Sequence, residues 1–366
     1  MHWRSSARDC TTMSAIPERP EQITPAWISQ AFASRHPGAE AVSVAVVDAH
    51  SGTTGRARLR VAWKPPADAP TAVFAKLAPT DPIQREMVIS TGMGKREARF
   101  YAELASDVPV RVPKPYGSRW NEAGSAYLML MEDVGASGCR FPTWKDPAVP
   151  RYASGMMESL AQLHAHFQQS PRFDRDLAWI EPPMRSTIGP LLTKAALEAF
   201  GDDMPASFHE MARIYIDHTQ AFCDRLDAGS PTLIHGDAHL GNLLLEDDRI
   251  GLLDWACLAK APGMRDVAYF LSNSISTELR RSQERELVGV YLESLERAGG
   301  MAPRFEEAWR QYRLYAACGW IAATVTAAAG SRMQSLEIGM RSMKRSTEAI
   351  IDLDTPALLR EELGLS

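Results

Sequence analysis

The chain has 366 residues, of which 45% are hydrophobic and 23% are charged. This length predicts two domains or lobes, and this composition excludes a disordered, collagen-like or disulfide-stapled protein. With 40 basic against 45 acidic residues, the formal net charge is −5, so the chain lacks the overall positive field that attracts nucleic acid or an anionic membrane. We therefore expect no nucleic-acid partner and no membrane partner.

The use of cysteine and the N-terminal segment indicate a cytoplasmic location. The cysteines lie far apart and form no Cys-x-x-Cys pair, which argues against a disulfide framework and a thiolate metal site and is typical of a reducing cytoplasm. Residues 1–20 contain no apolar run, so we expect a flexible tail rather than a signal peptide. Residues 314–330 are alanine-rich and too weakly apolar to span a membrane, which favours a buried helix.

The patterns in chain order begin with strands. Period-two alternation predicts strands at residues 41–47 and 56–63, joined by a turn-rich segment. A third strand is predicted at 71–77, a helix with three- and four-residue apolar spacing at 94–104, and a continuous apolar strand at 126–131. Residues 21–133 are therefore expected to form an N-terminal lobe made of an antiparallel sheet and one helix.

Helical patterns dominate the chain after residue 134. Two short apolar runs, at 232–234 and 250–253, interrupt them. Helices are predicted at 151–169, 207–227, 284–298, 305–328 and 336–353, and one more opens at 265. The expected fold class is α+β, with a small antiparallel-sheet N-terminal lobe and a larger, mainly helical C-terminal lobe over residues 134–366.

The two short runs bracket the residues that carry chemistry. Asp237 lies five residues before Asn242, and Asp254 follows in the tripeptide Leu253-Asp-Trp255. Phosphoryl transfer needs a carboxylate for the acceptor hydroxyl's proton and hard oxygen ligands for Mg²⁺, and these three residues supply both. Two other readings stay open: ordinary turn residues, and a zinc site formed by the alternating His235, Asp237 and His239, to which no cysteine contributes.

The complete stretch resembles a known family. His235-Gly-Asp-Ala-His-Leu-Gly-Asn242, then Leu253-Asp-Trp255, then Arg265-Asp-Val-Ala-Tyr-Phe-Leu271 is similar to the aminoglycoside phosphotransferase and choline kinase family. This family is the small-molecule branch of the protein-kinase-like fold, and its ecdysteroid-kinase-like group resembles the chain most. The resemblance is strong over residues 233–271 and extends to the order of elements in the N-terminal lobe.

The resemblance implies roles for the residues of the loop. Asp237 would be the catalytic base, and Asn242 and Asp254 would hold Mg²⁺. His235 and Asp266 would support the loop structurally, with Asp266 also capping its helix. The resemblance leaves the role of His239 open.

The resemblance also implies a nucleotide site for ATP in the N-terminal lobe. Lys76, the charged residue in the third strand, would bind phosphate, and a buried ammonium needs a carboxylate partner, for which Glu97 is expected and Glu86 is the alternative. The turn between the first two strands would cover the phosphates through its backbone N–H groups, and the linker strand would contact adenine. The turn comprises Ser51, Gly52, Thr53, Thr54 and Gly55, and the linker residues are Met131, Glu132 and Val134.

Each of these assignments has a plainer structural alternative. Lys76 could face water from an edge strand, Glu97 could lie on a solvated helix face, and Gly52 and Gly55 could form an ordinary hairpin turn. These alternatives are tested by burial and pairing.

The predicted function is an ATP- and Mg²⁺-dependent phosphotransferase that moves the γ-phosphate to a hydroxyl of a small molecule. The alternative is a catalytically silent nucleotide-binding sensor or scaffold of the same fold. A protein kinase is disfavoured because Gly236 replaces the arginine before the base, Asp254-Trp255 replaces Asp-Phe-Gly, and no Ala-Pro-Glu follows. The helices after residue 284 mix both charges with aromatic residues and suit a neutral or lipophilic alcohol as well as an aminoglycoside.

Overall fold

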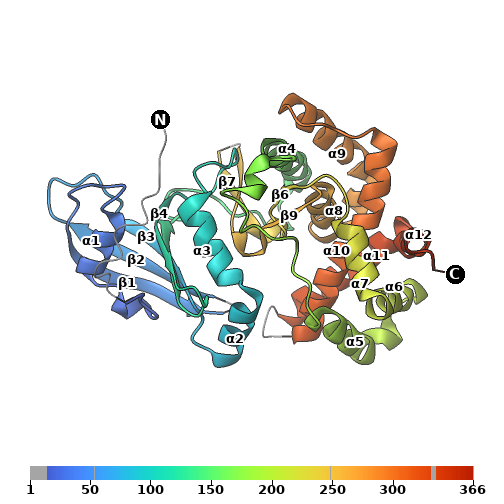
Figure 1. Ribbon diagram of the computed structural model, residues 1–366, viewed down its shortest axis with the longest axis horizontal. Helices are drawn as coiled ribbons and strands as arrows, with labels where there is room; N and C mark the ends of the chain where they lie inside the picture. The colour runs from blue at the N-terminus through green and yellow to red at the C-terminus, as the bar shows by residue number, and fades with distance from the viewer. Residues whose placement is uncertain (1–14, 53, 248, 331–334, 366) are drawn as a thin grey trace. The chain divides into compact units, whose positions relative to one another are not determined.

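The computed structural model describes residues 15–52, 54–247, 249–330 and 335–365 (Figure 1). These residues cluster into two compact units. The first unit runs up to Glu103 and resumes over Lys114–Asp133, and the second comprises Leu104–Pro113 and Val134–Ser366. The sequence placed Leu104–Pro113 in the first lobe, whereas in the structure this segment groups with the second unit. Residues 1–14 of the expected tail lie outside the described residues.

A five-stranded antiparallel sheet, counted over the described residues, forms the first unit, in the strand order β1-β2-β3-β5-β4. Ala57, Leu59 and Val61 of β2 are buried while the arginines between them are exposed, as the alternation predicts. The strands are β1 (Ala41–Ser51), β2 (Gly55–Trp63), β3 (Ala72–Leu77), β4 (Pro115–Trp120) and β5 (Tyr127–Glu132).

The described part of the first unit holds three α-helices, not the single helix that the sequence predicted. They are α1 (Pro25–Phe32), α2 (Pro82–Thr91) and α3 (Met93–Glu103). Each of the two unpredicted helices begins at a proline behind a capping side chain: Thr24 accepts the N–H of Trp27, and Asp81 accepts two backbone N–H groups. The predicted helix, α3, packs against β4 and β5 (Figure 1).

Helices make up most of the second unit. α10 packs against α8, α11 and α5, and α4 packs against α9. The helix predicted at 207–227 is two helices, because the chain breaks at His218. The helices are α4 (Val149–Phe167), α5 (Ile188–Phe200), α6 (Ala206–Asp217), α7 (Thr219–Asp227), α8 (Met264–Asn273), α9 (Thr277–Arg297), α10 (Phe305–Ala329), α11 (Leu336–Asp352) and α12 (Thr355–Leu363).

The alanine-rich segment predicted as a buried helix lies in α10, where Ala316, Ala317, Trp320 and Ala323 are buried. Among the helices of the described residues, none combines the length and the apolar character that crossing a membrane would require.

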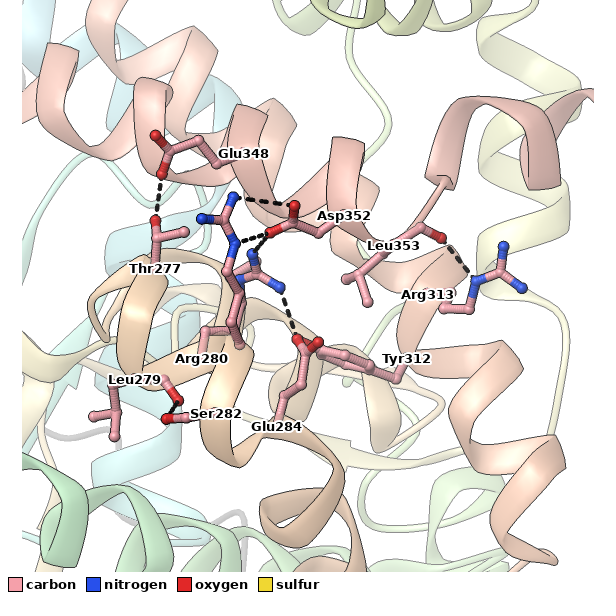
Figure 2. Close-up of polar contacts among 12 residues, drawn as sticks. Thr277, Leu279, Arg280, Ser282, Glu284, Tyr312, Arg313, Glu348, Asp352 and Leu353 are labelled. Atoms are coloured by element: carbon pink, nitrogen blue, oxygen red, sulfur yellow. Dashed lines mark hydrogen bonds and ion pairs between the residues drawn. The ribbon is translucent and has the colours of Figure 1, made fainter.

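Buried charge joins α9, α10 and α11. The side chain of Arg280 is fully buried and pairs with Glu284 at 2.8 Å and with Asp352 (Figure 2). The Tyr312 hydroxyl donates to the same Glu284 at 2.7 Å. A buried guanidinium is tolerated only with such partners, so these contacts fix the three helices together.

Two small antiparallel strand pairs position the loops that carry the candidate residues. β6 (Thr232–Ile234) pairs with β9 (Ala259–Ala261), and β7 (Leu243–Glu246) pairs with β8 (Arg249–Leu252). The N–H of Leu253 donates to the carbonyl of Asn242 at 2.8 Å, so the segments after β6 and after β8 lie side by side.

The segment Leu104–Pro113 belongs to the second unit because Arg111 attaches it to the β7–β8 pair. The Arg111 carbonyl accepts the N–H of Leu252 at 2.8 Å. Its guanidinium binds both carboxylate oxygens of Glu246, at 3.0 and 3.1 Å.

Candidate active site

The loop at residues 235–242 begins with two backbone N–H groups held by one carboxylate. Asp266, which is 1% exposed, accepts the N–H of His235 at 2.6 Å through Oδ2 and that of Gly236 at 2.9 Å through Oδ1. Its Oδ2 also lies 3.4 Å from Nε2 of the buried His164, whose Nδ1 pairs with the Tyr291 hydroxyl at 3.0 Å. Asp266 thus lies where the sequence expected a support for the loop. The expectation that it also caps its helix is wrong, because the N-cap of α8 is Gly263 and, among the described residues, no side chain caps the helix.

The second loop residue must be glycine. Gly236 has a φ of +80°, and a Cβ atom there would lie 2.1 Å from the carbonyl oxygen of Cys257. The neighbouring His235 ring packs against Trp255, with ring centroids 4.7 Å apart, and its Nε2 lies 2.8 Å from the Leu253 carbonyl. His235 therefore joins the 235–242 loop to the segment that carries Asp254.

Three side chains hold the Asp237 carboxylate. The Tyr269 hydroxyl donates to Oδ1 at 2.7 Å. Asn242 Nδ2 donates to Oδ2 at 3.2 Å and to the Asp237 carbonyl at 2.9 Å. His239 Nε2 lies 3.5 Å from Oδ2, which gives this histidine a partner that the sequence left open.

The same contacts keep Asp237 ionised. Burial acts to raise the pKa of Asp237, but the charge of His239, followed by the hydrogen bonds of His239 and Tyr269, holds this pKa well below its usual range. Burial lowers the pKa of His239, and the carboxylates of Asp237 and Asp254 outweigh burial and raise it. Burial and the Asp237 charge raise the pKa of Tyr269 well above its usual range, so its hydroxyl is the donor to Asp237.

Asn242 and Asp254 offer the oxygen ligands that a magnesium ion requires. Asn242 is 8% exposed and uses Nδ2 on Asp237, which leaves Oδ1 as the side-chain oxygen suited to a cation. Asp254 has a φ of +59° and leads into the short 3₁₀ helix Trp255–Cys257. Backbone held in this region is uncommon for residues other than glycine and is often found at functional sites. Two hard oxygens fit Mg²⁺, which keeps several waters and binds phosphate as well.

The zinc alternative gains no support from the structure. Across the described residues, no group of three or more His, Cys, Asp or Glu side chains is arranged to hold a metal ion. His235 instead uses its ring nitrogens on the Leu253 carbonyl and the Asp237 N–H.

The first unit contains the candidate lysine and its partner. Lys76 is 5% exposed and its Nζ lies 2.6 Å from both carboxylate oxygens of Glu97, which is fully buried. Neither residue faces water, so the edge-strand and solvated-helix alternatives are wrong. Glu86 lies exposed on α2 and is not the partner.

The glycine-containing turn is the tip of the β1–β2 hairpin. Its backbone bends where the Gly52 N–H donates to the Thr54 carbonyl at 3.1 Å. The Ser51 and Thr80 hydroxyls lie 3.2 Å apart. Thr53 lies outside the described residues. The turn is thus a hairpin, a geometry that also presents backbone N–H groups, and its contact with phosphate stays a prediction for Ser51, Gly52, Thr53, Thr54 and Gly55.

The linker residues are buried and partly engaged within their own units. Met131 and Glu132 end β5, and the Glu132 N–H donates to the Lys114 carbonyl at 2.9 Å. The Val134 carbonyl accepts the Cys139 N–H at 3.1 Å. Their contact with adenine stays a prediction, as does the convergence of Lys76 with the loop residues of the second unit.

Sequence reasoning missed the side chains that hold the loop from α8 and α4. Tyr269 donates to the Asp237 carboxylate. Ser274 accepts the Leu240 N–H at 3.0 Å, and His164 contacts Asp266. One signal was available: Tyr269 lies three residues after Asp266, so the two side chains share a helix face.

Comparison with known proteins identifies the family. Residues 91–315, more than half of the chain, match the model of the phosphotransferase enzyme family. The chain belongs to this family. Membership confirms the predicted family and the predicted class of enzyme, a phosphotransferase. The finer resemblance to the ecdysteroid-kinase-like group stays a prediction.

Solved structures show the same fold. A Ralstonia eutropha JMP134 protein, described provisionally as an aminoglycoside phosphotransferase, has a TM-score of 0.50 and 15% identity, covering 90% of this chain and 97% of that one. Choline kinase from Cryptosporidium parvum Iowa II has a TM-score of 0.53 and 11% identity, covering 88% and 93% respectively. These likenesses confirm the predicted kinase-like α+β fold. No curated protein matches the chain.

Proposed function

We propose that this phosphotransferase uses ATP and Mg²⁺ to move the γ-phosphate to a hydroxyl group of a small molecule. The single observation that supports this proposal best is the setting of Asp237. Its carboxylate is ionised and held by Tyr269, Asn242 and His239, in a loop whose backbone is fixed by Asp266.

The chemistry requires little from the protein beyond position and charge. Asp237 would orient the acceptor hydroxyl and take its proton while the acceptor oxygen bonds to the γ-phosphorus and the bond to the β-phosphate oxygen breaks. Asn242 and Asp254 would hold Mg²⁺, which neutralises charge on the phosphates when bound. Lys76, oriented by Glu97, would bind phosphate oxygens.

A hydroxylated small molecule is the proposed partner, because the family acts by phosphoryl transfer and Asp237 suits a hydroxyl. Cytoplasmic location and the lack of nucleic-acid or membrane partners stay predictions from composition.

An ADP-release screen against hydroxylated compounds tests the proposal. The native chain should release ADP with at least one acceptor, and Asp237→Asn should lower that rate by about 100-fold or more, the usual worth of a general base, while still binding ATP. The matched control is Asp202→Asn, which removes an exposed carboxylate of the same unit and should leave the rate unchanged.

Two results would contradict the proposal in different ways. Equal ADP release by native protein and Asp237→Asn would remove the base from the mechanism. Tight ATP binding with no ADP release for any acceptor would favour the silent sensor or scaffold instead.

A further inference from the structure

One face of α8 holds the 235–242 loop at three places. Asp266 accepts the N–H groups at the start of the loop, Tyr269 donates to the Asp237 carboxylate, and Ser274 accepts the Leu240 N–H just past the end of the helix. Positions 266, 269–270 and 273–274 recur at three to four residues and therefore lie on one face. Two of these contacts fix the loop backbone, whereas the contact of Tyr269 reaches the side chain of the proposed base.

The partners of the Asp237 carboxylate leave few orientations open. A carboxylate offers about four acceptor sites. Tyr269 uses one on Oδ1 at 2.7 Å, and Asn242 and His239 approach Oδ2 at 3.2 and 3.5 Å. The bond from Tyr269 is the shortest of the three and the one that reaches Oδ1, so it decides the rotation of the carboxylate about its Cβ–Cγ bond.

We propose that Tyr269 is a positioning residue of the phosphoryl-transfer reaction, holding Asp237 in the orientation that receives the acceptor hydroxyl. This inference rests on the proposed function. Loss of the phenol oxygen would leave Oδ1 without its donor, and the carboxylate would rotate toward Asn242 and His239. Misplacing a reacting group by a fraction of its hydrogen-bond length slows the chemical step without weakening nucleotide binding.

The Tyr269 hydroxyl has an alternative role, which the test must distinguish from positioning. It lies 2.7 Å from the Asp237 carboxylate, the distance at which an acceptor hydroxyl would bind. If Tyr269 merely filled the acceptor's place, its removal would make the site more accessible and speed turnover. A positioning role predicts the opposite sign.

The chain offers a closely matched control for Tyr269→Phe. Tyr312 is buried, and its hydroxyl also donates to a carboxylate, that of Glu284, at 2.7 Å. Glu284 keeps its ion pair with Arg280 when this hydroxyl is removed (Figure 2), just as Asp237 keeps Asn242 and His239. Tyr312→Phe therefore removes the same group from an equivalent bond that has no link to the loop.

Steady-state kinetics of both variants, with an acceptor found by ADP release, test the inference. Tyr269→Phe should lower kcat by about 10- to 100-fold with the KM for ATP within about twofold of native. Tyr312→Phe should change neither parameter, while both variants shift Tm by similar amounts. A native kcat in Tyr269→Phe, a raised kcat, or an equal loss in Tyr312→Phe would each overturn the inference.

A measurement without turnover keeps the test decisive if no acceptor is found. The Tm shift caused by Tyr269→Phe is measured in the native background and in Asp237→Ala, where the partner carboxylate is gone. The shift should be clearly smaller in the second background, because the bond is already lost. Equal shifts in both backgrounds would show that Tyr269 does not act on Asp237. An inactive native protein with unequal shifts would instead count against the proposed function alone.

Discussion

Replacing Asp266 by asparagine removes one of the two acceptors that hold the loop backbone. The carboxylate accepts the N–H of His235 through one oxygen and that of Gly236 through the other, at 2.6 and 2.9 Å. Asparagine has nearly the same shape but offers a single oxygen, and its NH₂ group would face the remaining N–H. Asp266→Asn therefore tests the hydrogen bonds rather than the packing.

The expected loss of unfolding free energy follows from these two hydrogen bonds. One buried backbone N–H loses its partner, at a cost of about 1–3 kcal/mol, and the other bond changes from a charged to a neutral acceptor, at a cost of about 1 kcal/mol. The expected loss of unfolding free energy is about 2–4 kcal/mol, a large share of the ~5–15 kcal/mol typical of whole proteins. For a unit of this size the Tm should fall on the order of 10 °C. Turnover should fall as well, because Asp237 directly follows the two residues whose N–H bonds are lost or weakened.

Urea unfolding followed by tryptophan fluorescence measures this loss, and Trp255 is a suitable reporter because its ring packs on His235. The control is Asp202→Asn, an exposed change expected to stay within about 0.5 kcal/mol of native. If Asp266→Asn were equally stable and equally active, the two N–H bonds could not be what fixes the loop, and the role given to α8 would have to be abandoned.

Two further predictions concern a buried pair and two glycines. Lys76→Met should lower the free energy of unfolding by about 3–5 kcal/mol, because it leaves the Glu97 charge buried alone, and adding Glu97→Leu should recover most of that stability without recovering ATP binding. Urea unfolding measures the stability and ATP titration measures the affinity. If the double variant retained its ATP affinity, the role of Lys76 would be contradicted. Gly236→Ala should cost about 2–5 kcal/mol, because its Cβ would meet the Cys257 carbonyl, whereas Gly289→Ala in α9, with no atom within 4 Å of the added Cβ, should gain about 0.5–1 kcal/mol. If the denaturation midpoints of the two glycine variants shifted in the same direction, the steric reasoning would be refuted.

Periodicity located the long elements because burial imposes it. β2 alternates since one face of its strand is covered, and β5 is apolar from Tyr127 to Met131 because both of its faces are buried. Several of the missed elements are too short for a period to stand out: α1 and α2 span eight and ten residues, and β9 is a three-residue strand defined by its pairing with β6. The 13-residue helix α5 was missed as well. The break at His218 between α6 and α7 occurs without glycine or proline, so sequence pattern favoured one continuous helix.

The residues of the candidate site also fall into those that the sequence could locate and those that needed the structure. His235, Asp237, Asn242 and Asp254 could be found because a short motif holds them at fixed spacing. The choice between Glu97 and Glu86 needed the structure. Gly92, with a φ of +66°, ends α2 in the left-handed conformation, so the two glutamates lie on different helices. Of the two, only Glu97, on α3, contacts Lys76.

The buried polar groups of the loop explain why the motif looks as it does. Asp266, His235 and Asn242 are all less than 10% exposed and use their polar atoms on the backbone or side chains of the loop. An apolar core of the same volume would be at least as stable as such a network, so stability alone does not account for these residue types.

What the network provides is a fixed direction for one carboxylate that remains partly exposed, with 30% of the Asp237 side chain accessible to solvent. A base must combine this fixed direction with access, because the acceptor hydroxyl has to reach it at hydrogen-bond distance. The loop gives Asp237 both: Asp266, His235 and Asn242 are buried, and the Asp237 carboxylate is partly exposed.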